Sequence, residues 1–294
     1  ALADAGIAID EENRARIGVI FGTGVGPMES MENFSRPLIE EGPQAANPAV
    51  FPNTVYNAAG GQVAMHVGTV GPASTVTAGH AAGASALCYG YDLVSTNQAD
   101  AIICLAVDTL TETVIRAYRE LGTVATEQGL DGGFALAEAG LALVLERRSS
   151  AQARGARIYG EVLGYGITSD ARGVARWDPR GAGLERAMRL ALDQAGLAPG
   201  EIGAVWANAS GYRAADVPEA AAIRRLFDGG ARVVAPKRQL GEPMGAGAAL
   251  SAALALKGWE KGAGDIAPTG PVLINSMSLG GTNFAIVLAP YHQD

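Results

Sequence analysis

The chain has 294 residues, 48% of them hydrophobic, so it is long enough to bury a large core as one domain or as two fused halves. Its net charge of −8 at pH 7 argues against nucleic-acid binding, and no stretch is long and apolar enough to span a membrane. Two cysteines, Cys88 and Cys104, give no disulfide framework, and no signal peptide is recognisable. With 40 glycines, these features predict a compact α/β protein of the reducing cytoplasm.

The first half of the chain alternates predicted strands and helices. Short apolar runs mark the strands, and apolar residues at helical spacing mark the helices. The glycine turn at 22–26 has a second interpretation as a phosphate-binding loop, but no Lys-Ser/Thr pair follows its glycines. The elements expected here are a helix end at 1–7 closed by Gly6, a strand at 16–21, helices at 31–41 and 54–67, a strand at 74–77, a helix from residue 81, a strand at 101–107, a helix at 109–121 and a strand at 141–146.

The second half repeats this alternation. A polar connector at 149–155 is the one candidate boundary, dividing the chain into 1–150 and 151–294. Asp216 is expected to cap a helix that has Pro218 in its first turn. The alternation predicts mostly parallel sheets with helices on both faces. The elements expected here are a strand at 156–166, a helix at 184–195, a strand at 203–207, a helix at 216–227, a strand at 233–235, a helix at 244–258, and a hairpin of strands at 272–275 and 284–288.

Residues 71–96 form the most informative stretch. They begin with Gly-Pro, continue as a short extended run, and then surround His80 with small residues before an apolar helical pattern. This order predicts a strand, a tight turn and a helix, with His80 at the N-terminus of the helix. Backbone N–H groups at such a point favour negative charge, and enzymes use this geometry to present a nucleophile.

This stretch resembles the nucleophile segment of the β-ketoacyl synthases, the condensing enzymes of fatty-acid and polyketide synthesis. His80 stands where that family keeps its catalytic cysteine. The ending VLINSMSLGGTNFAIVL is similar to the family's Gly-Gly-Thr-Asn signature, in which Gly280, Gly281 and Thr282 would let backbone approach the acyl site closely. The resemblance implies the family's thiolase fold, an α/β architecture of duplicated βαβαβ halves with layered helices and two mostly parallel sheets.

The resemblance also covers the other two positions of the family's Cys-His-His triad. After the strand at 203–207 the family has Asn-Ala-His-Gly, and this chain has Ser210 in place of the histidine. In PKRQLGEPMGAG the second histidine corresponds to Glu242, whereas Lys237 is retained, as is Glu138 in FALAEAG. The resemblance therefore implies a site whose framework is kept and whose triad is replaced, with no metal and no cofactor.

A replaced triad implies that condensing activity is lost. A thiolate holds an acyl group as a thioester, whereas an imidazole forms only a labile acyl adduct. An ionised Glu242 would repel a developing enolate, and Ser210 has only one hydrogen bond to donate.

Each of the two cysteines is a candidate for a displaced nucleophile, but the favoured interpretation of each is a small buried hydrophobic residue. His66 is expected to be a packing or interface residue rather than a ligand.

Among family members, the chain looks most like the non-catalytic chain-length-factor-like subunits, although these usually carry glutamine where His80 stands. This implies a heterodimer with an active ketosynthase, or a homodimer, formed along residues 56–77, with an acyl carrier protein as a further partner. Because an acidic carrier is repelled by the average surface, its docking site must be a local basic patch. In the alternative, His80 is a base or transient acyl acceptor of a decarboxylase, transacylase or hydrolase. A thiolase acting on CoA esters fits the Gly-Gly-Thr-Asn ending less well.

By resemblance, one strand and one helix of the first half would precede residue 1. This strand is expected inside its sheet, where an unfilled slot would leave backbone groups unpaired at a cost of roughly several kcal/mol. The strand is then absent, cleaved, or supplied by another polypeptide.

Overall fold

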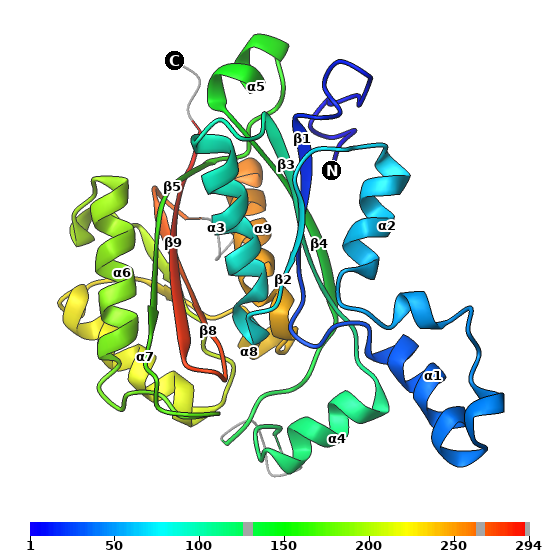
Figure 1. The fold of residues 1–294 in the computed structure, drawn as a ribbon. Helices are drawn as coiled ribbons and strands as arrows, with labels where there is room; N and C mark the ends of the chain where they lie inside the picture. Colours follow the sequence, from blue (N-terminus) through cyan, green and yellow to red (C-terminus); the bar gives the residue numbers. More distant parts are fainter. Residues whose placement is uncertain (126–131, 263–267, 292–294) are drawn as a thin grey trace.

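The computed structural model describes residues 1–125, 132–262 and 268–291, which form two mixed β-sheets with helices between and outside them (Figure 1). Helices α3 (Ala82–Ser95) and α9 (Gly247–Lys261) lie between the two sheets. Helix α2 (Ala58–Val67) covers the outer face of the first sheet, and α6 (Ala182–Ala195) covers that of the second. The expected α/β layering is confirmed.

The first sheet has the strand order β2-β1-β3-β4. Strand β1 pairs in parallel with β2 and β3, and β4 is antiparallel to β3. These strands are β1 (Ile17–Gly22), β2 (Ala73–Val76), β3 (Ala101–Asp108) and β4 (Ala139–Glu146).

The second sheet has the order β5-β9-β8-β6-β7. Strand β6 is parallel to β7 and β8, whereas β9 is antiparallel to both β8 and β5. This sheet is therefore mixed rather than mostly parallel, because the short turn between β8 and β9 reverses the chain. Its strands are β5 (Glu161–Ser169), β6 (Ala204–Trp206), β7 (Val233–Val234), β8 (Val272–Met277) and β9 (Thr282–Ala289).

The two sheets repeat one topology, which confirms the expected duplication. The order β7-β6-β8-β9 in the second half corresponds to β2-β1-β3-β4 in the first, with the last strand antiparallel in each. The expected empty slot inside the first sheet is wrong, because β1 pairs with β3 along its whole length, from Ile17 opposite Ala101 to Gly22 opposite Ala106. In the second sheet the initial strand, β5, lies at the edge and not in the interior.

Two local expectations differ from the structure and a third is confirmed. The connector at 149–155 is largely helical, as α5 (Arg148–Arg154). The helix expected from residue 216 begins earlier, as α7 (Arg213–Leu226), so Asp216 is not its N-cap and instead accepts hydrogen bonds from the preceding loop. The expected helix end at residues 1–7 is confirmed, since Gly6 N donates to Ala3 O, Ile7 N donates to Leu2 O, and Gly6 has a φ of 63°.

The remaining helices are α1 (Met28–Glu40), which continues through Pro37, and α4 (Glu112–Glu120) and α8 (Lys237–Leu240). Five short 3-10 turns complete the described structure: Pro43–Ala45, Phe51–Asn53, Gly79–Ala81, Pro199–Glu201 and Met244–Ala246.

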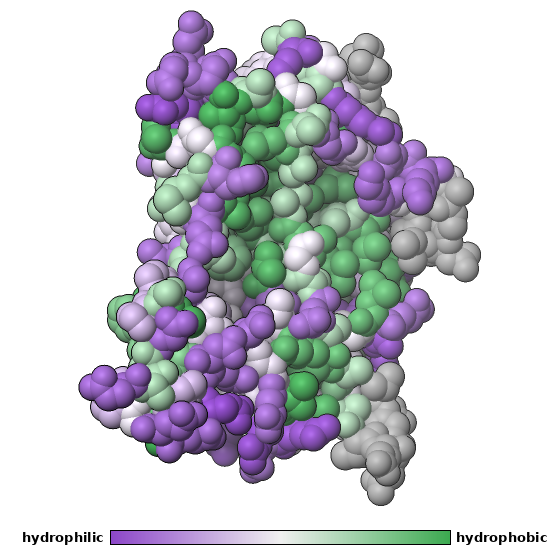
Figure 2. Space-filling view, turned by 90° about the vertical axis from the view of Figure 1, so that its right-hand side faces the viewer, coloured by the Kyte–Doolittle hydropathy of each residue, from purple (hydrophilic) through white to green (hydrophobic). Residues whose placement is uncertain are grey.

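The outer face of the first sheet is only partly covered. Helix α2 packs over β1, and the neighbouring Leu105, Ala142 and Val144 of β3 and β4 keep some exposure. Figure 2, which views the molecule from this side, shows a broad apolar area hollowed near its middle. A main core lies between the two sheets and includes Trp206, Ile274 and Ile286.

Candidate active site

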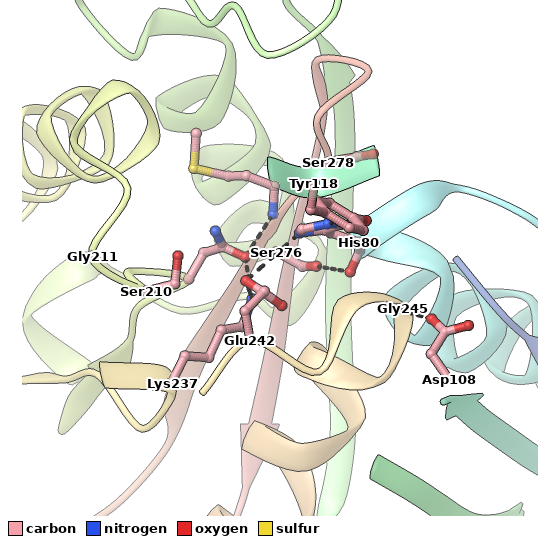
Figure 3. Close-up of polar contacts among 12 residues, drawn as sticks. His80, Asp108, Tyr118, Ser210, Gly211, Lys237, Glu242, Gly245, Ser276 and Ser278 are labelled. Carbon is pink, nitrogen blue, oxygen red and sulfur yellow. Dashed lines mark hydrogen bonds and ion pairs between the residues drawn. The ribbon is translucent and has the colours of Figure 1, made fainter. Parts of the chain in front are cut away.

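His80 lies at the turn between β2 and α3, as its sequence context predicts. The chain enters this turn through Gly79, which has a φ of 55° and leaves no room for a side chain, since a Cβ there would lie 2.6 Å from Ser278 Oγ. The His80 side chain points inward and is only 3% exposed. Its own backbone carbonyl accepts a 3.5 Å hydrogen bond from Ser276 Oγ (Figure 3).

Both ring nitrogens of His80 have a polar neighbour (Figure 3). Nε2 lies 2.7 Å from the hydroxyl of Tyr118 on α4, and Nδ1 lies 3.6 Å from Oε2 of Glu242, just after α8. A carboxylate can only accept, so Nδ1 is the nitrogen that carries a proton in the neutral ring, and Nε2 then accepts from the phenol.

Glu242 is buried and paired with a cation. Lys237 Nζ donates to Glu242 Oε2 at 3.0 Å and to Asn208 Oδ1 at 2.8 Å, and the same Asn208 oxygen accepts from Met277 N at 3.1 Å. Burial alone would raise the pKa of Glu242, but Lys237 and then His80 hold that pKa below its usual value. Glu242 is therefore a carboxylate at neutral pH, paired with the ammonium of Lys237.

Two aromatic rings lie against the imidazole. The ring centroids of Tyr118 and Phe134 lie 5.5 Å and 5.7 Å from that of His80, and both rings are buried. Burial, followed by the charges of Glu242 and Asp108, raises the pKa of Tyr118, so its hydroxyl keeps its proton and can donate.

The other residues expected at the site are placed less closely. Ser210 is buried, but no hydrogen bond among the described residues joins its hydroxyl to His80 or Glu242; its backbone N–H binds Asp216. Glu138 is exposed and accepts from Leu110 N at 2.6 Å, ahead of α4. The structure thus brings together His80, Glu242 and Lys237, and leaves Glu138 apart.

Gly280, Gly281 and Thr282 form the turn into β9. Gly281 has a φ of 84°, which suits glycine, and Thr282 O accepts from Ser278 N. Because Ser278 also lies against Gly79, this turn packs directly on the segment that carries His80.

Neither cysteine has the surroundings of a nucleophile. Cys88 and Cys104 are free and buried, and burial raises the pKa of both thiols. His66 lies exposed on α2.

Sequence reasoning missed Tyr118, Phe134 and Asn208 as neighbours of the site. For Tyr118 a weak signal was present, since Val114 and Tyr118 are four residues apart on one apolar face of a helix. In the described ranges, no group of three or more His, Cys, Asp and Glu side chains is arranged to hold a metal ion, and no helix has the length and apolarity to cross a bilayer.

Sequence models of known families match both halves of the chain. The N-terminal domain of β-ketoacyl synthases matches residues 1–151, and the C-terminal domain matches residues 159–267. The chain belongs to the β-ketoacyl synthase family. One family member, 3-oxoacyl-[acyl-carrier-protein] synthase 2 of Staphylococcus aureus, is 32% identical over 266 residues, which cover 86% of this chain but only 66%, just under two thirds, of that relative.

Solved structures of the family have the same fold. The ishigamide ketosynthase/chain length factor matches 99% of this chain and 79% of its own with a TM-score of 0.89 and 29% identity. A type II polyketide ketosynthase in complex with its acyl-carrier protein matches 99% of this chain and 82% of its own with a TM-score of 0.90 at 22% identity, which supports the fold alone. The expected ketosynthase fold is confirmed.

Proposed function

We propose that this β-ketoacyl synthase family member is a non-condensing, chain-length-factor-like subunit that pairs with an active ketosynthase in fatty-acid or polyketide synthesis. One observation carries the proposal: the residue at the family's cysteine position is an imidazole, held between the carboxylate of Glu242 and the hydroxyl of Tyr118. Within this proposal the halves 1–150 and 151–294 form one unit, because His80 comes from the first half and Glu242 from the second.

The chemistry of this arrangement opposes condensation. Carbon–carbon bond formation needs a stored thioester and donors that stabilise negative charge on the carbonyl oxygen. Here His80 cannot store a thioester, and Glu242 places an anion where the family has an imidazole. The framework cation Lys237 neutralises Glu242 and is therefore not free to stabilise an enolate.

A surface suited to the partner lies along α2 and β2. Strand β2 is at the edge of its sheet, so its outward backbone groups can pair with another strand. Met65 on α2 and Val70 before β2 are 76% and 61% exposed, which is unfavourable in water and suits an interface. We propose this surface, within residues 56–77, as the seam with the ketosynthase, and an acyl carrier protein as a further partner of the pair.

Co-purification tests the pairing. This chain, carrying a tag, would be expressed with an untagged active ketosynthase from the same organism, and the two are expected to elute in equal amounts. Met65→Asp should weaken the pairing, whereas Leu190→Asp, a matched change on α6 at the opposite side of the molecule, should leave it intact. Recovery of this chain as a monomer, with the ketosynthase in the flow-through, would overturn the proposal.

A second candidate function uses His80 chemically, in decarboxylation, acyl transfer or hydrolysis. The observation in its favour is Glu242, which faces Nδ1 at 3.6 Å and could orient the imidazole as a base. His80→Gln separates the two candidates, because glutamine keeps hydrogen-bonding capacity but is no base. A subunit role predicts unchanged rate and product length in the complex, whereas a chemical role predicts a loss of about 10²-fold or more.

A further inference from the structure

Tyr118 contacts the site from α4, an element outside the family signatures. Its hydroxyl reaches Nε2 of His80 at 2.7 Å, and its ring packs edge-on against Phe134 with a centroid distance of 5.9 Å. On α4, Val114 and Tyr118 are the buried residues, so they form the face by which the helix packs on the body. Tyr118 is thus a fixed wall of the site rather than a surface side chain.

The direction of the hydrogen bond follows from the neighbours of the ring. Glu242 is a carboxylate at Nδ1, so in the neutral imidazole the lone pair is on Nε2. Tyr118 keeps its proton, and its hydroxyl therefore donates to that lone pair. This is the lone pair with which an imidazole takes up a proton or attacks an acyl carbon.

We propose that Tyr118 is a positioning residue that keeps His80 chemically silent, by occupying its Nε2 lone pair and, with Phe134, by closing the space beside the ring. This inference rests on the proposed non-condensing function and explains how the site is kept inactive. In this arrangement an acyl group can bond to Nε2 of His80 only after the hydroxyl of Tyr118 moves away from that atom.

The outer side of α4 supports this closure. A groove of about 570 Å³ lies along α4 and the residues before it, and neither Tyr118 nor His80 lines it. A molecule bound in that groove would therefore contact neither Tyr118 nor His80. The groove is lined by Leu110, Thr111, Glu112, Ile115, Arg116 and Arg119.

Labelling with diethyl pyrocarbonate tests the closure, because this reagent acylates the unprotonated nitrogen of accessible imidazoles. Peptide mass spectrometry reports each histidine separately, and exposed His66 is the internal reference. In the wild-type chain His80 should be labelled far more slowly than His66. Tyr118→Ala should accelerate labelling of His80 by at least about tenfold, since access no longer requires local opening.

Tyr118→Phe separates the hydrogen bond to Nε2 from the blocking of access to His80, because it removes the hydroxyl and keeps the ring and its packing. Its ring still blocks access, so labelling of His80 should stay slow. The nitrogen-15 signal of Nε2 should move towards that of an imidazole nitrogen without a hydrogen bond. Tyr165→Phe is the matched control, because it deletes a partly buried hydroxyl that bonds Asp92, far from His80, and should change neither readout.

Three results would overturn the proposal: equal labelling of His80 and His66 in the wild type, unchanged labelling in folded Tyr118→Ala, or an unmoved Nε2 signal in Tyr118→Phe. None of these depends on a partner protein. Failure here is therefore distinguishable from failure of the proposed subunit role, which co-purification decides.

Discussion

The buried carboxylate of Glu242 depends on one cation, Lys237, whose Nζ lies 3.0 Å away while both side chains are about 1% exposed. Lys237→Met removes that cation and leaves a buried anion. We expect the free energy of unfolding to fall by about 3–5 kcal/mol, the usual cost of breaking a buried pair from one side. Urea unfolding curves of the variant and the wild type measure this fall in the free energy of unfolding.

The matched test adds Glu242→Gln to Lys237→Met. The double variant no longer buries a charge, so it should recover much of the lost stability. Arg189→Met, which breaks an exposed pair with Glu185 on α6, should cost less than about 1 kcal/mol. A Lys237→Met variant as stable as the wild type would show that Glu242 is not held as an anion.

Glu219 on α7 gives the stability of the folded chain a dependence on pH. Burial raises its pKa from 4.5 to about 7, although Asn208 N and Asn275 Nδ2 bond one of its oxygens. A raised pKa means that the folded state holds the proton more tightly, so this contribution to stability is full below pH 4.5 and is lost as the pH rises to about 7. The loss amounts to roughly 3 kcal/mol at about 1.4 kcal/mol per pKa unit.

Glu219→Gln tests this pH dependence of stability, because the glutamine side chain stays neutral at every pH. Relative to the wild type, the variant should gain stability progressively between pH 4.5 and 8. Unfolding curves at five pH values measure the difference. A difference that stays constant over this range would contradict the raised pKa.

Single residues show where sequence reasoning reached the site and where it could not. His80 and Glu242 were assigned to one site through the family motifs, and Nδ1 of His80 lies 3.6 Å from Oε2 of Glu242 in the structure. Tyr118 could not be placed, because helical spacing gives the buried face of α4 but not the residue that this face meets in the folded chain. Ser210 was assigned by motif alone. Among the described residues, no hydrogen bond joins its hydroxyl to the imidazole of His80, and its backbone N–H bonds Asp216 instead.

At the scale of elements, strongly apolar runs were predictable and boundaries set by long-range contacts were not. The strands at 101–107 and 272–275 and the closing hairpin appear as β3, β8 and β9, because buried runs of this length have few alternatives. The predicted start of α7 at Asp216 was wrong, because the carboxylate of Asp216 accepts hydrogen bonds from Ser210 N and Gly211 N in the loop before the helix and does not cap the helix. The strand at 156–166 begins later, at Glu161.

Glycines at element crossings make the packing testable. Gly83 in α3 faces the turn before α9, where an added Cβ would lie 2.7 Å from Gly245 O and 3.0 Å from Ala106 Cβ. We expect Gly83→Ala to destabilise the chain by roughly 1–3 kcal/mol through overpacking. Gly61→Ala is the matched control in helix α2, where nothing lies within 4 Å.

Gly61→Ala should be neutral or stabilise the chain by about 0.5–1 kcal/mol, the helix-propensity gain of alanine over glycine. Chemical denaturation of the isolated chain measures both variants. If Gly83→Ala were as stable as Gly61→Ala, the close approach of α3 to the turn before α9 would not be a constraint on the fold.

For the whole molecule, the site exists only because the two halves meet. His80 comes from the first half, while Glu242, Lys237 and Asn208 come from the second. The duplication was predictable from the repeated order of strands and helices. The pairing of β1 directly with β3 was not, because local patterns do not fix the order of strands within a parallel sheet.

The intact chain should not retain an acyl group. After incubation with acyl or malonyl carrier-protein thioesters, we expect no stable adduct, because the imidazole of His80 forms only a labile acyl derivative and both thiols are buried with raised pKa values. Intact-protein mass spectrometry measures this. His80→Cys introduces a thiol at the family position and should gain at most a slow adduct, since Glu242 still places an anion beside the reacting carbonyl. A stoichiometric adduct on Cys88 or Cys104 of the wild type would locate the nucleophile elsewhere and contradict the assignment of His80.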